Sequence, residues 1–274
     1  MNESTTTEDF GTRAIALPKF TITNSFVFPL VMSHKEIAKP FIEAALGIKI
    51  YDLKEPEQEK TEQVGIFSKS VRYDVFTQQI DENGETISSF DLEMQVKDTK
   101  ELPKRARYYQ SIRDTHELHR GTMYKSLKDQ YVLFICPDDI FKKDLPIYSF
   151  QNYAAENKDI ALNDRTFKNF YIFNAYDKLP DAHPLKPYLK YFATNTPDST
   201  ETEEIDTKVK WYQTDNQTQE RYMTWEQEIQ LAREDEREKE RERNQKIIEE
   251  KVRALTEKDR EIAELKAQLA KMQK

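Results

Sequence analysis

Apolar and polar residues alternate strictly along residues 90–96, whose sequence is FDLEMQV. This period of two predicts a β-strand with one apolar face and one polar face. Lys97 extends the polar face, which also carries Asp91, Glu93 and Gln95. The first question about this chain is whether that polar face is solvated or binds something.

A similar strand pattern covers residues 71–80, and the later strand is predicted over residues 86–97. The segment DENGE separates the two patterns. Within it, Asn83-Gly84 favours a two-residue type I′ turn, which joins the strands as an antiparallel hairpin.

The register of this predicted hairpin brings two carboxylates together. Asp74 lies opposite Glu93, and Arg72 lies opposite Gln95. Opposed residues have Cβ atoms about 4.5–5.5 Å apart, a spacing at which like charges repel. A divalent cation would reverse the repulsion, and two carboxylates with backbone and water oxygens suit Mg²⁺ or Mn²⁺. The alternative is a solvated sheet face on which Arg72 neutralises both acids.

The remaining patterns predict a mixed α/β domain. Residues 33–46 are typical of a helix with Ser33 as its N-cap, and Pro40 is expected to kink it or to mark its start. Three further elements are expected along the chain: a helix over 102–118, a strand buried on both faces over 131–136 and a strand-like run over 170–175. This order of helix, hairpin, helix and strand is typical of an α/β fold.

The C-terminal quarter differs in composition. Residues 198–222 are expected to form an acidic and polar linker that includes a solvated loop over 198–206. Residues 223–274 predict a charged helix or a short coiled coil. Two sets of apolar residues recur there at spacings of three and four, and we expect them to be out of heptad register: Ile248, Val252 and Leu255, then Ile262, Leu265, Leu269 and Met272. The alternative is a single solvated helix.

Composition limits the function classes. The formal net charge is −8, so any contact with nucleic acid requires a local basic patch, and residues 97–107 are the best candidate. Cys136 is the only cysteine, and its apolar surroundings predict a buried, unreactive thiol. The lone thiol favours a cytoplasmic location. No apolar run is long enough to cross a bilayer, so no membrane contact is expected. Residues 1–14 are expected to be disordered.

Several of these segments resemble those of the Rpn-type recombination-promoting nuclease/putative transposase family, part of the PD-(D/E)XK nuclease superfamily. The matching text is an Asp on one strand and Glu93-Met94-Gln95 on the next, followed by KRARYYQS, together with FVFPLVM (26–32), FIEAALGIKI (41–50) and GTMYKSLKDQYVLFICPDDIF (121–141). The resemblance implies a restriction-endonuclease-like core over residues 15–197: a mixed central sheet flanked by helices. It also implies Mg²⁺-dependent cleavage of DNA.

By motif position, the resemblance makes Asp74 and Glu93 metal ligands, with Glu43 on the first helix as a third. The superfamily normally has Lys at the position of Gln95, where it activates water. A Gln amide orients water without adding charge, and Lys97 is expected to lie on the same strand face and to reach the site.

The helix over 102–118 supplies the candidates for binding DNA. Arg105 and Tyr109 are one turn apart, so both can contact a scissile phosphate, and Lys104 adds positive charge. The alternative for these residues is ordinary helix packing.

Two functions of different classes therefore remain. One is a metal-dependent DNA endonuclease of a recombination-promoting or transposase-like type, assisted by Mg²⁺ or Mn²⁺. The other is a catalytically inactive interaction scaffold that forms homo-oligomers through its C-terminal helix.

Overall fold

The computed structural model describes residues 19–63, 69–97 and 99–272. The N-terminal segment expected to be disordered, residues 1–14, lies outside this range. The chain divides into two compact units, a first one that ends at Gln219 and a second one that begins at Glu220.

The first unit is an α/β structure, as the patterns predict. Its strands are β1 (Asp52–Leu53), β2 (Glu57–Gln58), β3 (Thr61–Glu62), β4 (Val71–Arg72), β5 (Val75–Ile80), β6 (Thr86–Met94), β7 (Asp129–Cys136), β8 (Ile147–Phe150) and β9 (Thr166–Ile172). Its helices are α1 (Val27–Met32), α2 (Lys35–Leu46), α3 (Leu102–Glu117), α4 (Lys186–Thr194) and α5 (Thr200–Thr214), with 3₁₀ turns η1 (Tyr124–Ser126) and η2 (Phe173–Lys178).

One mixed sheet organises this unit, with the strand order β1-β5-β6-β7-β9-β8 and β2 also paired to β5. β5 and β6 are antiparallel, whereas β6, β7 and β9 run parallel to one another. The central strand β7 is buried along most of its length, as its continuous apolar pattern predicts.

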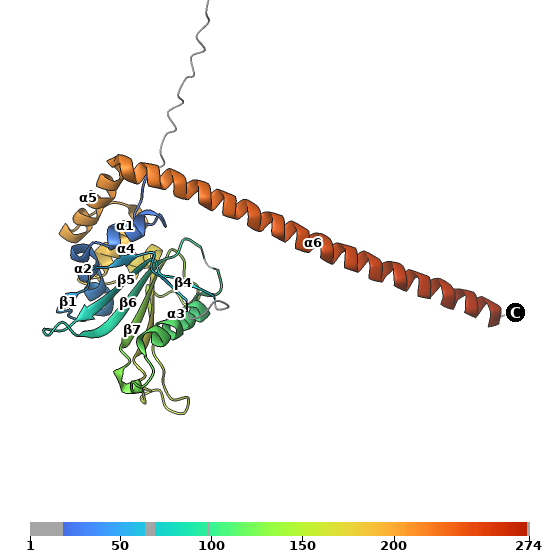
Figure 1. Ribbon diagram of the computed structural model, residues 1–274, viewed down its shortest axis with the longest axis horizontal. Coiled ribbons are helices and arrows are strands. Elements are labelled where there is room, and N and C mark those ends of the chain that lie inside the picture. Colours follow the sequence, from blue (N-terminus) through green and yellow to red (C-terminus); the bar gives the residue numbers. More distant parts are fainter. Residues whose placement is uncertain (1–18, 64–68, 98, 273–274) are drawn as a thin grey trace, which may run out of the picture. The chain divides into compact units, whose positions relative to one another are not determined.

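Helices cover both faces of the sheet, and Figure 1 shows α3 and α2 on opposite sides of it. On the α3 side, Leu102 and Ala106 pack against Phe134 of β7 and Phe170 of β9. On the other side, the Tyr171 hydroxyl donates a 3.0 Å hydrogen bond to the Ala45 carbonyl of α2. The sheet is therefore a layer between helices, and any polar group on its α3 face is enclosed unless it lies at an edge.

The hairpin forms in the predicted register, although its turn differs from the prediction. Val75 pairs with Leu92 and Phe76 with Asp91, as expected. The loop is not the two-residue Asn83-Gly84 turn, because Asp81 N–H donates to the Glu85 carbonyl and leaves a three-residue loop with Gly84 at φ 82°. A bulge near the turn shifts the register by one residue and restores the predicted pairing.

The first helix is α2, preceded by the short α1. Ser33 is not its N-cap: the cap is His34, and Ser33 Oγ donates to the Leu30 carbonyl. Pro40 lies inside α2, which runs uninterrupted to Gly47, a left-handed C-cap at φ 66°.

The expected acidic loop is a helix. Ser199 and Thr202 form a reciprocal capping box at the start of α5, and Ile205 and Val209 are buried. The capping signal and a buried apolar stripe outweigh the high charge of the segment, so the linker prediction for residues 198–222 is wrong over most of its length.

The second unit, which begins at Glu220, contains all but the first four residues of the helix α6 (Asn216–Met272). This helix confirms the predicted charged helix. Ile248, Leu255, Ile262 and Leu269 recur every seven residues along it, and each side chain is about half exposed. This heptad line joins the two apolar sets, yet Val252 follows Ile248 by four residues whereas Leu265 follows Ile262 by three. The second core position therefore changes between the sets, which are out of heptad register as expected. None of the helices described is long and apolar enough to span a membrane.

Candidate active site

The polar face of FDLEMQV is not solvated. Asp91, Glu93 and Gln95 are 4%, 0% and 7% exposed, because this face of β6 lies beneath α3. Burial of a carboxylate is costly unless it is paired or neutralised. The enclosed position therefore argues against the solvated-face interpretation and requires an explanation for each acid.

Asp74 and Glu93 are brought together as the hairpin register predicts. Asp74 lies just before β5, where the chain passes from the β3–β4 pair to the main sheet. Its N–H donates a 3.0 Å hydrogen bond to Glu93 Oε1, and its own Oδ2 accepts a 3.0 Å bond from Met94 N–H. The backbone N–H of Asp74 thus holds the Glu93 carboxylate, and the N–H of Met94, the residue after Glu93, holds the Asp74 carboxylate.

Arg105 of α3 extends into this cluster. Its guanidinium forms an ion pair with Glu93 Oε2, donates from Nε to the Tyr109 hydroxyl at 2.7 Å and reaches Gln95 Oε1 at 3.4 Å. Tyr109 in turn donates to the Arg72 carbonyl at 3.4 Å. The structure therefore places Arg105, Tyr109 and Gln95 around Glu93, as the sequence proposed.

Asp91 is the member that sequence reasoning missed. Both of its carboxylate oxygens are buried, and no N–H or hydroxyl group in the described part of the chain donates to them. The Glu93 carboxyl lies close enough to form a hydrogen bond with Asp91 when one of the two is protonated. A cavity of about 10 Å³ lies beside it, lined by Ser89, Gln110 and Gln130 among others, with room for about one water molecule. The available signal was its place on the same face as Glu93, two residues away.

We call Asp74, Asp91 and Glu93 the acid cluster. Burial raises the pKa of all three carboxyls, most of all those of Asp91 and Glu93. The negative charges raise the pKa further, since Asp74 acts on both of the others, while Arg105 opposes the effect. Three acids with one arginine form a site with excess negative charge, which favours a proton or a cation.

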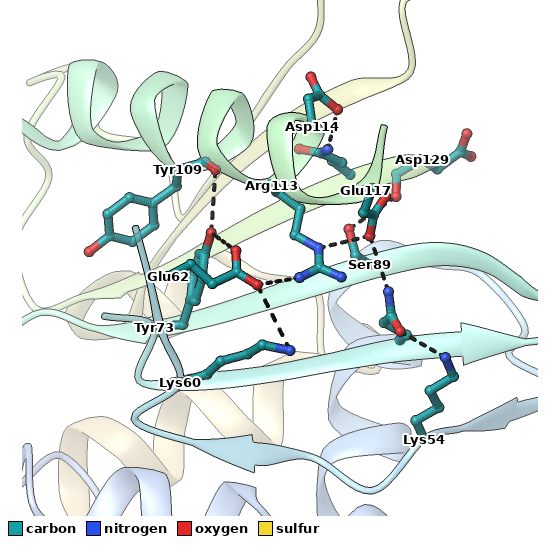
Figure 2. Close-up of polar contacts among 12 residues, drawn as sticks. Lys54, Lys60, Glu62, Tyr73, Ser89, Tyr109, Arg113, Asp114, Glu117 and Asp129 are labelled. Carbon is teal, nitrogen blue, oxygen red and sulfur yellow. Dashed lines mark hydrogen bonds and ion pairs between the residues drawn. The ribbon is translucent and has the colours of Figure 1, made fainter. Parts of the chain in front are cut away.

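A second polar cluster lies beneath the C-terminal half of α3. Arg113 forms ion pairs with Glu62 and Glu117, and Lys60 lies 3.9 Å from Glu62. Tyr73 donates a 3.1 Å hydrogen bond to Glu62 Oε2. Figure 2 shows these side chains converging between the helix and the strands. We call Lys60, Glu62, Arg113 and Glu117 the ion-pair network.

Three predicted site residues lie elsewhere. Glu43 Oε1 accepts from Ile50 N–H, just before β1, and β1 pairs with the far end of β5 from Asp74. Lys97 is exposed in a bend beyond the end of β6, so it does not share the strand face of Glu93. Lys104 is exposed on α3.

Arg72 does not lie opposite Gln95. It pairs with Thr61 in the β3–β4 ladder, and Gln95 N–H instead donates to the Ile135 carbonyl of β7. The predicted β-strand over 71–80 is split at Asp74, which redirects Arg72 to an exposed position near Glu59.

No family model, characterised protein or solved structure matches the chain. Within the described residues, no group of three or more His, Cys, Asp and Glu side chains is arranged to hold a metal ion. The geometry and electrostatics of the acid cluster are therefore the features of this chain that bear on function.

Proposed function

We propose that this chain is a metal-dependent DNA endonuclease with a restriction-endonuclease-like core, similar to the Rpn-type recombination-promoting nucleases. The observation that carries the proposal is the meeting of Asp74, Glu93, Gln95 and Arg105 at one end of β6, under the first turns of α3. An excess of buried carboxylates lowers the stability of the fold. In a site that hydrolyses phosphodiesters with a divalent cation, these carboxylates would serve as ligands of the cation.

Asp74 and Glu93 are the two carboxylates that would hold Mg²⁺ or Mn²⁺, on one condition. Asp74 and Glu93 supply hard oxygen ligands, and Asp74 is partly accessible to solvent. Both oxygens of Glu93 are already engaged, Oε1 by Asp74 N–H and Oε2 by Arg105. Arg105 must therefore release Glu93 before a cation can bind there. A bound cation would polarise a phosphoryl oxygen and lower the pKa of water.

Three neighbouring side chains have roles that follow from their donors. Arg105 is 29% exposed, so its guanidinium can turn from Glu93 to a DNA phosphate and form a charge-assisted pair there. The Tyr109 hydroxyl, which accepts from Arg105 in this structure, holds the guanidinium near the site. Gln95, beside Glu93, orients the attacking water through its amide.

The test is plasmid nicking by the purified full chain with Mg²⁺, Mn²⁺ or EDTA. We expect cleavage only with metal, and a loss of at least about a hundredfold in Asp74→Asn and in Glu93→Gln. Glu82→Gln is the matched control, because Glu82 is an exposed carboxylate in the hairpin loop. Equal cleavage by wild type and Asp74→Asn would place the activity outside the acid cluster.

The second candidate is an inactive scaffold that assembles through α6. It is favoured by the ion pair of Arg105 with Glu93, which satisfies Glu93 without a metal, and by the exposed heptad line on α6. Sedimentation of the full chain with Leu255→Lys, beside the control Thr256→Lys on an exposed polar position, would test assembly. Assembly that depends on Leu255, with no nicking under any metal, would favour the scaffold.

A further inference from the structure

A groove runs along one flank of α3, and no residue of the acid cluster lines it. Its volume is about 540 Å³, within the range of sites that hold drug-sized ligands. One wall comes from α3 between Pro103 and Asp114, and the other comes from β8, β9 and the residues that follow β8. The eleven helical rises from Pro103 to Asp114 extend the α3 wall over about 16 Å.

Aromatic rings form one part of the groove. Phe141, Phe150 and Phe170 contact one another, with centroids 5.0 Å apart for Phe141 and Phe150 and 5.8 Å apart for Phe150 and Phe170. Phe150 is 42% exposed, whereas Phe170 is buried. An exposed ring held by two others is a rigid surface on which a planar group can stack.

Two cations line the same groove. Lys168 of β9 lies directly opposite Phe150 in the sheet, and Arg107 projects from α3. Neither forms an ion pair with a carboxylate among the residues that the structure describes. Burial lowers the pKa of Lys168, with Asp164 opposing that effect. The two cations are therefore available to an anionic ligand.

Two acids complete the lining, each accepting from neighbouring side chains. Asp114 accepts a hydrogen bond from Gln130, and Asp164 accepts from Asn152 and Thr166. The groove thus combines an aromatic surface, two cations and two hydrogen-bond acceptors. A nucleotide carries the complementary groups: a planar base, a phosphate and, in A, C and G, an amino group.

The groove begins at the N-terminal end of α3, within two residues of Arg105. Its α3 wall begins at Pro103 and includes Arg107, while Arg105 between them faces the acid cluster. We propose that the groove binds a single-stranded segment of the nucleic acid whose phosphodiester is cut at the acid cluster, with a base stacked on Phe150. This inference rests on the proposed nuclease function. A duplex keeps its bases stacked on one another, so it cannot occupy the groove in this way.

The experiment measures fluorescence anisotropy of labelled oligonucleotides with the full chain in EDTA, so that binding is separated from cleavage. The probes are a ten-nucleotide oligo-dC, an oligo-dT of equal length and a ten-base-pair duplex. We expect oligo-dC to bind more tightly than oligo-dT, because only cytosine offers an amino donor to Asp114 and Asp164. Equal affinity for the two would overturn the role of these acids.

Two variants test the groove directly. Phe150→Ala should weaken oligo-dC binding by about 5- to 150-fold, the range for losing one stacked base, and Lys168→Gln should weaken it less and reduce its salt dependence. Tyr153→Ala and Lys158→Gln are the controls, since both residues are exposed outside the groove on the same β8–β9 connection. Thermal melting checks that each variant folds.

Unchanged oligo-dC binding in both groove variants, or no oligo-dC binding by wild type, would overturn the proposal. An equal loss for the duplex would also overturn it, because it would make the groove a general anion site. The nuclease proposal is judged separately by nicking with Asp74→Asn. Binding that depends on Phe150 without any cleavage would leave the groove standing and remove the nuclease function.

Discussion

The acid cluster and the ion-pair network lie on the same face of the sheet under the same helix, yet their charges are arranged differently. The network has two acids, Glu62 and Glu117, and two bases, Lys60 and Arg113, all within ion-pair distance of at least one partner. The acid cluster has three carboxylates and only Arg105. Both are enclosed, so burial alone does not account for the difference.

The comparison separates a charge-balanced buried arrangement from an unbalanced one. Buried charges that balance one another offset part of their desolvation cost, whereas an unbalanced buried acid keeps the full cost. The ion-pair network, whose Arg113 lies eight residues after Arg105 on α3, has no such excess of negative charge. In the proposed function a bound cation balances the charges of the acid cluster, and the variants that follow test this difference.

The largest effect is expected from breaking the network. Arg113→Met leaves Glu62 and Glu117 buried without their shared cation, and it should lower the free energy of unfolding by about 3–5 kcal/mol. Urea denaturation at pH 7 measures it. Arg107→Met, an exposed arginine on the same helix, is the control and should cost under about 0.5 kcal/mol. A loss of under about 0.5 kcal/mol in Arg113→Met as well would mean that the ion-pair network does not stabilise the fold.

Removing the arginine of the acid cluster should affect function more than stability. In Arg105→Met, Glu93 can take up a proton, because burial already raises its pKa, so the cost in stability should be below that of Arg113→Met. Affinity for Mn²⁺ should rise about tenfold because the competing cation is gone, while nicking falls about a hundredfold through loss of the phosphate contact. Calorimetry and nicking rates measure the two changes.

The result that would contradict this pair of expectations is weaker Mn²⁺ binding in Arg105→Met. It would show that Arg105 supports the metal site instead of occupying it. Lys104→Met on the adjacent exposed position controls for general loss of positive charge and should leave Mn²⁺ affinity unchanged.

How much of this site the sequence could predict depends on which interactions decide each position. Alternation and the Asn-Gly signal set the β5–β6 pairing, so Asp74 and Glu93 were correctly placed together. The predicted two-residue turn was wrong. The bulge at Ile87, which compensates for the longer loop and keeps the predicted pairing, has no signal in the local pattern. The strand pairing could therefore be predicted from local periodicity, whereas the length of the loop could not.

Two other site residues were misplaced, each for its own reason. The strand β6 ends at Met94, which removes Lys97 from the strand face of Glu93. Glu43 was assigned from motif position alone, and α2 places it at the other end of β5.

A pH-dependent effect is expected at Asp91. Its folded-state pKa lies above the unfolded value near 3.8, so its contribution to stability is present at low pH and is lost as pH rises toward the folded pKa. Asp91→Asn cannot ionise. In EDTA, the variant should therefore gain stability over wild type above about pH 4, by up to about 1.4 kcal/mol per pH unit.

Thermal unfolding of both proteins between pH 4 and pH 8 measures this gain. Asp138→Asn, an exposed acid after β7, should show a flat difference over the same range. A flat difference for Asp91→Asn as well would mean that Asp91 ionises without penalty, and the contrast between the acid cluster and the ion-pair network would lose its main support.

The smallest effect is expected at Lys97, where sequence and structure disagree most directly. If Lys97 supplied the charge that Gln95 lacks, Lys97→Ala would reduce nicking as strongly as Gln95→Ala. Because Lys97 is exposed beyond the end of β6, we expect its removal to change the nicking rate by less than about twofold. Gln95 is 7% exposed and contacts Arg105, so Gln95→Ala should cost about tenfold or more. A large loss for Lys97→Ala would mean that the bend folds back over the acid cluster when DNA binds, which would restore the lysine to the site.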